Sequence, residues 1–339
     1  MKVTTVDTHT EGQPTRIVVS GVGDLGGDTM AERCNEFRSR YDHMRVGLLA
    51  GPRGHPGLFG CVLVDPCDPS ADFGAVFMHN DGYIDVSGHA AMGVITALVE
   101  TGIVGADGDT ARVALDTPAG VISCEAEVKN GKAGTTVFRT VPSWVGLQGA
   151  SLQVPRCGEV IVDVAYGGNL LVSAWAEHLG VELTPHNMET VTAVAMAVKK
   201  AAADKLVVRS PETGERHEIG AVTVLDAPNS EPPALRMVQV YGPGVFDRSP
   251  GASAASARLA LMFARGEIFA EDEVIVESSM TDGRFRAKVL EPERVGARTA
   301  VATEITGRAF VTGFHDFVFD PEDPLSVVFP VGSSGTMSA

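Results

Sequence analysis

The stretches SGHAAMGVITALVETG (residues 87–102) and GASAASARLALMFARG (residues 251–266) decide the fold of this 339-residue chain. Each opens with very small residues, carries Ala-Ala at its fourth and fifth positions, becomes apolar, and stops at a glycine in its sixteenth position. A glycine there suits the left-handed residue that ends many helices. The repetition predicts two helices with the same role, and therefore two similar halves of the chain.

The bodies of the two helices, at residues 94–99 and 259–263, have little polar face, which indicates that each is nearly surrounded by its own sheet. The small residues at the two helix starts are compatible with either tight packing of the helices or the close approach of a ligand. A helix N-terminus offers unpaired N–H groups and a partial positive charge, and tiny residues let a carboxylate approach. An acid precedes each opening, Asp85 and Asp247, and could meet the ammonium of an amino acid. The pattern favours an amino-acid site between the two helix starts.

The rest of the chain is dominated by short β-branched runs that end at Gly, Pro or Asp, which predict strands. They cover residues 2–6, 15–20, 61–64, 113–116, 120–128 and 135–141, and then 160–166, 205–209, 221–225, 236–241, 273–278 and 310–319. Further helices are expected at residues 28–41 and 187–203, and loops at residues 142–155 and 226–233. Strands in both halves predict two sheet domains, with the first of these loops as their boundary.

Composition and charge restrict the class of protein. With 44% hydrophobic and 21% charged residues, the chain is typical of a soluble globular protein of two domains. A formal net charge of -16 without a basic stripe argues against nucleic acid or an anionic membrane surface as a partner. No window approaches the roughly 18 uninterrupted apolar residues of a membrane span, so a cytoplasmic location is expected.

The cysteines and histidines predict neither a disulfide framework nor a metal site. Five cysteines without a CxxC pair are expected to be reduced, mostly buried thiols. They are Cys34, Cys61, Cys67, Cys124 and Cys157. The nine histidines include no HExxH or similarly spaced cluster.

Six motifs span essentially the whole chain. They are DTHTEGQPTRIV (residues 7–18), GPRGH (51–55), SGHAAMG (87–93), YGGN (166–169), DRSP (247–250) and VTGFHDFVFDPEDPL (311–325). In this order they resemble the proline racemase superfamily, which includes hydroxyproline 2-epimerases and trans-3-hydroxyproline dehydratases.

The resemblance implies a diaminopimelate-epimerase-like fold of the α/β (α+β) class. Such a fold has two similar domains, each a curved mixed sheet around a central helix, with the active site in the cleft between them. The expected domains are residues 1–146, with residues 320–339 as a candidate addition, and residues 147–319. The resemblance further implies a small proline-like amino acid as substrate, no cofactor, no metal, and a monomer or homodimer.

Site residues are carried over by position. Ser87 and Gly251 fall where racemases of the superfamily hold two catalytic cysteines, one at each helix start. Gly88 and His89 match the family's Gly-His pair, and Asp247 matches its acid near the substrate amine. The residues expected to bind substrate are Gly88, Asn169, Asp247, Ala252 and Ser253.

The chemistry explains why cysteines are usual at these positions. Proton transfer at Cα without a cofactor needs a base near the operating pH, and a thiol of pKa about 8.5, lowered at a helix N-terminus, can serve. This chain has neither thiol. Ser87 would need activation, for which His89 is the nearest titratable group, and Gly251 offers only its N–H or space for water. The structural alternatives are an N-cap for Ser87, a structural hydrogen bond for His89, and capping of the DRSP turn for Asp247.

Dehydratases of the superfamily keep the first cysteine and replace the second with threonine, because β-elimination can proceed with a base on one face. This chain shares the loss of the second base, but it also lacks the first, and residues 252–255 replace a Gly-Thr-Gly-Thr-like run. An engineered exchange at Ser87 would also account for that serine, whereas the neighbours of Gly251 have changed with it.

We therefore expect one-base elimination or atypical isomerisation at Cα of proline or a hydroxyproline rather than two-thiol racemisation. One alternative is a 4-hydroxyproline 2-epimerase or proline racemase that uses Ser87, His89 or water. The other is a non-catalytic amino-acid-binding homologue.

Overall fold

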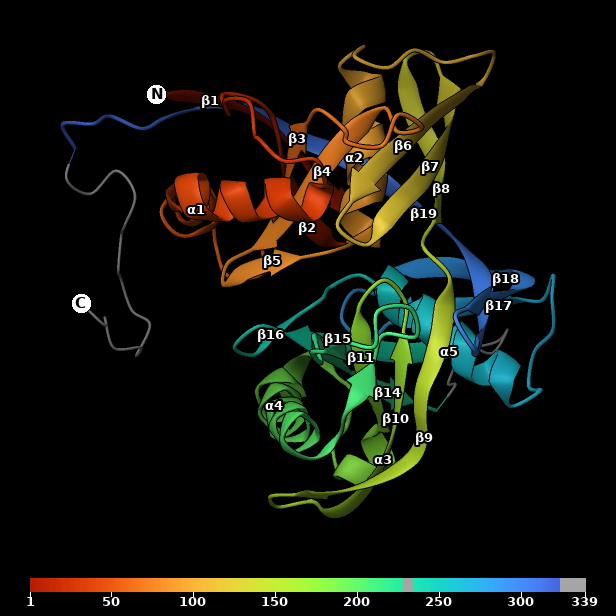
Figure 1. Ribbon diagram of the computed structural model, residues 1–339. Helices are drawn as coiled ribbons and strands as arrows, with labels where there is room; N and C mark the ends of the chain where they lie inside the picture. Colours follow the sequence, from red (N-terminus) through yellow and green to blue (C-terminus); the bar gives the residue numbers. More distant parts are fainter. Residues whose placement is uncertain (228–233, 324–339) are drawn as a thin grey trace.

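The computed structural model describes residues 1–227 and 234–323 of the chain. These residues form two lobes, joined by strands that run from one lobe into the other (Figure 1). The long strand β19 (Arg298–Val318) pairs with strands of both lobes, and the main sheet is continuous over 17 strands.

The elements of the first lobe are β1 (Lys2–Thr10), β2 (Gln13–Ser20), α1 (Met30–Leu49), β3 (Phe59–Val64), β4 (Phe73–His79), β5 (Gly82–Ile84), α2 (Gly88–Glu100), β6 (Thr110–Thr117), β7 (Gly120–Lys129) and β8 (Lys132–Arg139). The second lobe begins with β9 (Ser143–Val154), β10 (Gly158–Tyr166), β11 (Leu170–Trp175), α3 (Ala176–Leu179), the 3-10 helix η1 (Pro185–Asn187) and α4 (Met188–Lys205). It continues with β12 (Val208–Arg209), β13 (Arg216–His217), β14 (Ala221–Asp226), β15 (Ala234–Tyr241), β16 (Val245–Phe246), α5 (Ala252–Ala264), β17 (Glu273–Ser278) and β18 (Arg284–Val295).

The two repeated stretches are α2 and α5, and each is the central helix of its lobe. α2 is buried from Gly88 to Val99 and contacts β1, β2, β3, β6, β7, β8 and β19. α5 is buried over its first ten residues and contacts β9, β10, β18 and β19. Both helices are followed by a glycine in the left-handed region, Gly102 (φ 74°) and Gly266 (φ 70°). The predicted pair of enclosed helices is confirmed.

Several local predictions are confirmed and others are wrong. The helices expected at residues 28–41 and 187–203 are α1 and α4, although α1 continues to Leu49. The loop expected at residues 142–155 is instead β9, which pairs with β10 along its length. Of the strand expected at residues 205–209, only Val208–Arg209 forms a strand; Lys205 is the last residue of α4, and residues 206–207 connect the two elements. The loop expected at residues 226–233 lies largely outside the described residues.

Phe319, the residue after β19, pairs with the N-terminal residue Met1 and packs against α1 in the first lobe. Its backbone N–H donates to Met1 O at 2.8 Å, and the amino group of Met1 donates to Phe319 O at 2.7 Å. Its side chain is buried against α1, where a Cβ at Gly47 would lie 2.3 Å from the ring. Residues 324–339 of the proposed addition to this lobe lie outside the described part of the chain. The proposed division between residues 146 and 147 falls inside β9 and stays a prediction.

All five cysteines are free thiols, and three of them, Cys34, Cys61 and Cys124, are buried, as expected. Within residues 1–227 and 234–323, no helix combines the length and apolar character needed to cross a membrane.

Gly167, in the YGGN motif, lets α5 approach the end of β10 backbone to backbone. A Cβ at Gly167 would lie 2.3 Å from Ser253 O and 2.7 Å from Ala257 N, both in the main chain of α5. Main-chain atoms of a buried helix cannot rotate aside as a side chain can. The glycine therefore fixes how closely the first turn of α5 packs.

We predict that Gly167→Ala destabilises the protein by about 1–3 kcal/mol, because the added methyl overpacks a buried contact. Urea unfolding measures the change. The matched control is Gly105→Ala, where an added Cβ meets no heavy atom within 4 Å, and it should stay within about 0.5 kcal/mol of the parent. Equal stability of the two variants would contradict the tight packing.

Candidate active site

The structure brings the predicted site residues together where the two lobes meet. One cavity is lined by Ser87, Gly88, His89, Asn169, Asp247, Ala252 and Ser253, together with Phe59, Ile84, Val86 and Gln239. Gly251 immediately precedes this lining at the start of α5. The cavity measures about 20 Å³, which is room for about one water molecule. A proline-like molecule is several times larger than this space.

The starts of α2 and α5 face each other directly. A Cβ added at Gly88 would lie only 2.5 Å from the Cβ of Ala252. Neither helix has a side-chain cap: Ser87 and Gly251 occupy the N-cap positions without making a cap hydrogen bond. Two sets of first-turn N–H groups and two partial positive charges therefore lie close together, an arrangement that favours an anion such as a carboxylate.

The hydroxyl of Ser87 is close to His89 but is not positioned for a strong hydrogen bond. Its Oγ lies 3.4 Å from Nδ1 and 3.5 Å from Nε2 of the ring. A hydroxyl nearly equidistant from both nitrogens cannot lie in the ring plane along either nitrogen's bonding direction, and both distances are long for such a bond. Ser87 therefore neither caps α2 nor transfers its proton to His89 in this arrangement.

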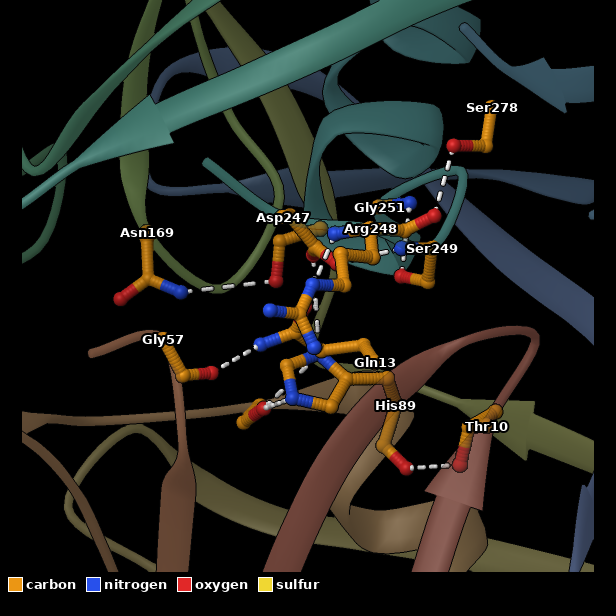
Figure 2. A network of polar contacts seen from close by, with 12 residues as sticks. Thr10, Gln13, Gly57, His89, Asn169, Asp247, Arg248, Ser249, Gly251 and Ser278 are labelled. Carbon is orange, nitrogen blue, oxygen red and sulfur yellow. Dashed lines mark hydrogen bonds and ion pairs between the residues drawn. The ribbon is translucent and has the colours of Figure 1, made fainter. Parts of the chain in front are cut away.

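His89 and Asp247 come from opposite lobes and face each other across the cavity (Figure 2). His89 Nδ1 lies 3.6 Å from Asp247 Oδ2, and both side chains are almost fully buried. Burial lowers the pKa of His89 to about 3 and raises the pKa of Asp247 to about 7. At neutral pH the pair is therefore a neutral imidazole beside a half-protonated carboxyl group, rather than an ion pair.

The two oxygens of Asp247 have separate tasks. Oδ1 accepts from the backbone N–H of Ser249 at 2.8 Å and so closes the DRSP turn. Oδ2 faces His89 and the cavity. The backbone N–H of Asp247 donates to Gln239 O at 2.8 Å, which ties the acid to β15. The turn-capping role considered for Asp247 is thus real, and it leaves one oxygen directed at the site.

Gly251 has a backbone that disfavours a side chain. Its φ of 83° and ψ of 94° are costly for L residues, and its N–H is held by Ser249 Oγ at 3.2 Å. An ideal Cβ there would lie 3.9 Å from Asp247 Oδ2. The carboxyl group of Asp247 therefore borders the space that a side chain at this position would enter.

Asn169 connects the two helix starts. Its Nδ2 donates to Val86 O at 2.9 Å in the first lobe and lies 3.4 Å from Ser253 Oγ in the second. The side-chain amide of Asn169 thus links the two lobes at the edge of the cavity.

Gln13 supports the site and was not predicted. Its side chain is fully buried; Nε2 donates to Gly57 O at 2.7 Å, and Oε1 accepts from the backbone N–H of Arg248 at 2.8 Å (Figure 2). Gln13 lies in the first sequence motif, and that position is the signal from which a role at the site could have been predicted. Phe59, whose ring packs edge-on against His89 at 4.5 Å between centroids, carried no such signal.

The expectation that acids flank the site on both sides is wrong for Asp85. This residue lines a different cavity of about 350 Å³, together with Trp144, Tyr166 and His217. Asp85 lies two residues before the N-cap Ser87, and the next residue, Val86, is the one whose carbonyl accepts from Asn169 at the active-site cavity. Of the two acids, only Asp247 lines the cavity.

None of the five cysteines stands at either helix start. None of them lines the cavity. Burial raises the pKa of Cys61 far above its usual range and that of Cys124 to about 12, so neither forms a thiolate readily.

Comparison with solved structures confirms the expected fold class. A hydroxyproline epimerase from Agrobacterium vitis, solved with bound trans-4-OH-L-proline, matches this chain with a TM-score of 0.90. The two are 27% identical, and the match covers 97% of this chain and 96% of that chain. The protein is therefore a mixed α/β protein of the diaminopimelate-epimerase-like class.

Comparison of sequences narrows the class to a family. The family model described as proline racemase matches residues 5–329, and the chain belongs to that family. A proline racemase from Clostridioides difficile is 34% identical over 320 residues, covering 94% of this chain and 95% of that protein. A trans-3-hydroxy-L-proline dehydratase from Bacillus thuringiensis subsp. konkukian is 34% identical over 329 residues, covering 97% of this chain and 98% of that protein.

A 4-hydroxyproline 2-epimerase from Streptosporangium roseum is 36% identical over 330 residues, covering 96% of each chain. Isomerase or lyase activity is thus supported for this protein. Because these three relatives are nearly equally similar to it, identity alone does not select among their reactions.

The raised pKa of Asp247 predicts that the stability of the protein depends on pH. Since burial raises the pKa of Asp247 from 3.8 to about 7, the folded state keeps a proton that the unfolded chain loses above about pH 4. The stabilisation is complete below that pH and is lost as the pH rises through about 7. Between pH 5 and 8 the parent should lose about 2–3 kcal/mol relative to Asp247→Asn. Urea unfolding of both proteins at several pH values measures this, and parallel pH profiles would contradict it.

Proposed function

We propose that this protein eliminates water from a 3-hydroxyproline-like amino acid, using Asp247 as the single group that moves the proton at Cα. The observation that carries the proposal is the raised pKa of Asp247, about 7, at a position beside the space left at Gly251. A base is most effective when its pKa lies near the operating pH. Of the titratable side chains that line the cavity, His89 and Asp247, only Asp247 meets this condition.

The pKa of His89 argues against activation of Ser87. An imidazole with a pKa of about 3 cannot hold a proton taken from a serine hydroxyl at neutral pH. The distances from Ser87 Oγ to the ring are also too long for a strong bond. We therefore propose that His89 stays uncharged and serves as a lining and hydrogen-bonding group beside Asp247. Ser87 is proposed to contact the substrate.

The substrate class follows from the convergent helix starts and from the relatives. The first-turn N–H groups of α2 and α5 would bind a carboxylate, and the carboxylate form of Asp247 would lie beside the adjoining amine and Cα–H. The structural relative from Agrobacterium vitis carries trans-4-OH-L-proline, and the Bacillus relative is a trans-3-hydroxy-L-proline dehydratase. A cyclic, secondary amino acid suits a cavity walled by Phe59, Ile84 and Val86.

In the proposed reaction, Asp247 alone takes up and returns the proton. The Asp247 carboxylate takes the Cα proton, and the electron pair left at Cα is stabilised through the substrate carboxylate by the two helix N-termini. The pair then forms the C2–C3 double bond as the C3–O bond breaks. Asp247 returns its proton to the departing oxygen, so that water leaves and the carboxylate is restored. The enamine released becomes the cyclic imine, a pyrroline carboxylate, by tautomerisation.

We predict that the protein converts trans-3-hydroxy-L-proline to a pyrroline carboxylate, and that Asp247→Asn lowers this rate by about 10²–10⁴, the usual contribution of a general base. Proton NMR of the reaction mixture measures both. Asp85→Asn is the matched control, because this acid lies in a separate cavity, and it should retain the parent rate within a few-fold.

Other products would overturn the proposal in distinct ways. Formation of the 2-epimer from trans-4-hydroxy-L-proline without any pyrroline product would favour the epimerase alternative. Tight binding of a proline analogue with no product and no exchange at Cα would favour a binding protein. Undiminished elimination by Asp247→Asn would show that another group moves the proton.

A further inference from the structure

A cavity of about 350 Å³ lies beside Asp85, where the two lobes meet, and it is separate from the active-site cavity. Its volume is within the range of sites that bind small molecules. The first lobe contributes Asp85, whereas the second contributes Trp144 from β9, Tyr166 from β10 and His217 from β13. We call it the aromatic cavity after these three rings.

The three rings hold one another in place. Trp144 and Tyr166 are directly paired across β9 and β10, and their rings stack with centroids 5.2 Å apart and planes 15° apart. The ring of His217 lies 5.9 Å from that of Trp144 and 5.4 Å from that of Tyr166 between centroids. Because these contacts lie within the protein, this side of the cavity is formed before any ligand arrives. Aromatic rings attract cations.

Two carboxyl groups, Asp85 and Glu212, line the cavity beside Tyr166. Burial, and then the negative charges of these two acids, raise the pKa of the Tyr166 phenol, so both acids lie near it. Asp85 is exposed to solvent, yet the surrounding protein raises its pKa through loss of water, as expected for a carboxyl group in a concave site. Among residues 1–227 and 234–323, neither acid makes a hydrogen bond or an ion pair through its carboxyl group.

The cationic side chains nearby have other partners. Arg294 lines the cavity, but it is exposed and its Nη2 donates to Ala297 O at 3.1 Å. The guanidinium of Arg38, which lowers the pKa of Asp85 from a distance, lies 4.8 Å from the ring centroid of Tyr83. The carboxyl groups of the aromatic cavity therefore favour a positively charged ligand.

The remaining walls make that ligand organic. They are apolar and consist of Pro118, Ala119, Val141, Pro142, Pro211 and Val295. A bare metal ion such as Ca²⁺ takes about six or more oxygen ligands, whereas these walls supply apolar side chains. An ammonium group on a small apolar body matches both the carboxyl groups and the walls.

We propose that the aromatic cavity binds a small organic ammonium ion, with its charge toward Asp85 and Glu212 and its apolar body against the rings of Tyr166 and Trp144. The ligand contacts both lobes. It also contacts the two segments that separate this cavity from the active site, since residues 85–87 and 166–169 each line one cavity at one end and the other cavity at the other end. This inference is independent of the proposed reaction.

Isothermal titration calorimetry of the intact protein with phenethylamine, which is protonated at pH 7, tests the proposal. Saturable binding at one site is expected. The alcohol 2-phenylethanol has the same shape without the charge, and phenylacetate has the opposite charge. Both should bind at least about tenfold more weakly, since they lack the charge-assisted hydrogen bonds. No saturable binding of the amine, or equal binding of all three compounds, would overturn the proposal.

Two variants locate the amine. Asp85→Asn and Glu212→Gln each remove one negative charge and should each raise the Kd of phenethylamine by about tenfold. Glu215→Gln is the matched control, because Glu215 lies on the same hairpin as Glu212 but does not line the cavity, and it should keep the parent Kd. A parent-like Kd in both cavity variants would place the amine elsewhere and contradict the proposal. Glu212 is exposed, so its variant keeps the test valid if Asp85→Asn fails to fold.

A crystal soaked in 4-bromophenethylamine gives a readout that needs no variant. An anomalous bromine peak beside Tyr166 and Trp144 is expected. A peak only in the cavity of Asp247 and His89 would show that the amine binds the active site instead, and would overturn the proposal.

Discussion

The close approach of two helix starts is the contact on which the rest of this structure depends. Gly88 of α2 meets Ala252 of α5, and Gly167 lets the main chain of α5 pack against the end of β10. Only residues with little or no side chain permit these distances. The contact brings two sets of unpaired N–H groups together, and it removes Asp247 and His89 from water at the same time.

Burial then sets the chemistry of the site. A carboxyl group withdrawn from water holds its proton more tightly, whereas an imidazole holds it less tightly, and the pKa values of Asp247 and His89 move in those opposite directions. The site thereby gains a base near neutrality without a thiol. The positive φ of Gly251 fits this arrangement, because a cysteine there would need a strained backbone and would border the carboxyl group. The serine at position 87, the glycine at position 251 and the raised pKa of Asp247 belong to one site.

The sequence predicted the parts of the fold and site that depend on local pattern. Repeated small openings and apolar bodies identified α2 and α5, and ordered motifs located the cavity residues. It failed where tertiary pairing overrides local signals: the prolines and glycines of residues 142–155 suggested a loop, but β9 pairs with β10 through irregularities in register. Asp85 shared the spacing of an acid before a helix, yet its segment faces another cavity. The protonation of Asp247 depends on burial by both lobes, which no single segment encodes.

The most direct test of the central claim is the fate of L-proline in heavy water. If Asp247 acts alone on one face of Cα, deuterium should enter at Cα with retention of the L configuration, because no group on the opposite face delivers a deuteron. Proton NMR for incorporation and chiral chromatography for configuration measure the two quantities together. We predict exchange without detectable D-proline. Formation of D-proline at the rate of deuterium incorporation would show two-face proton transfer and contradict the account.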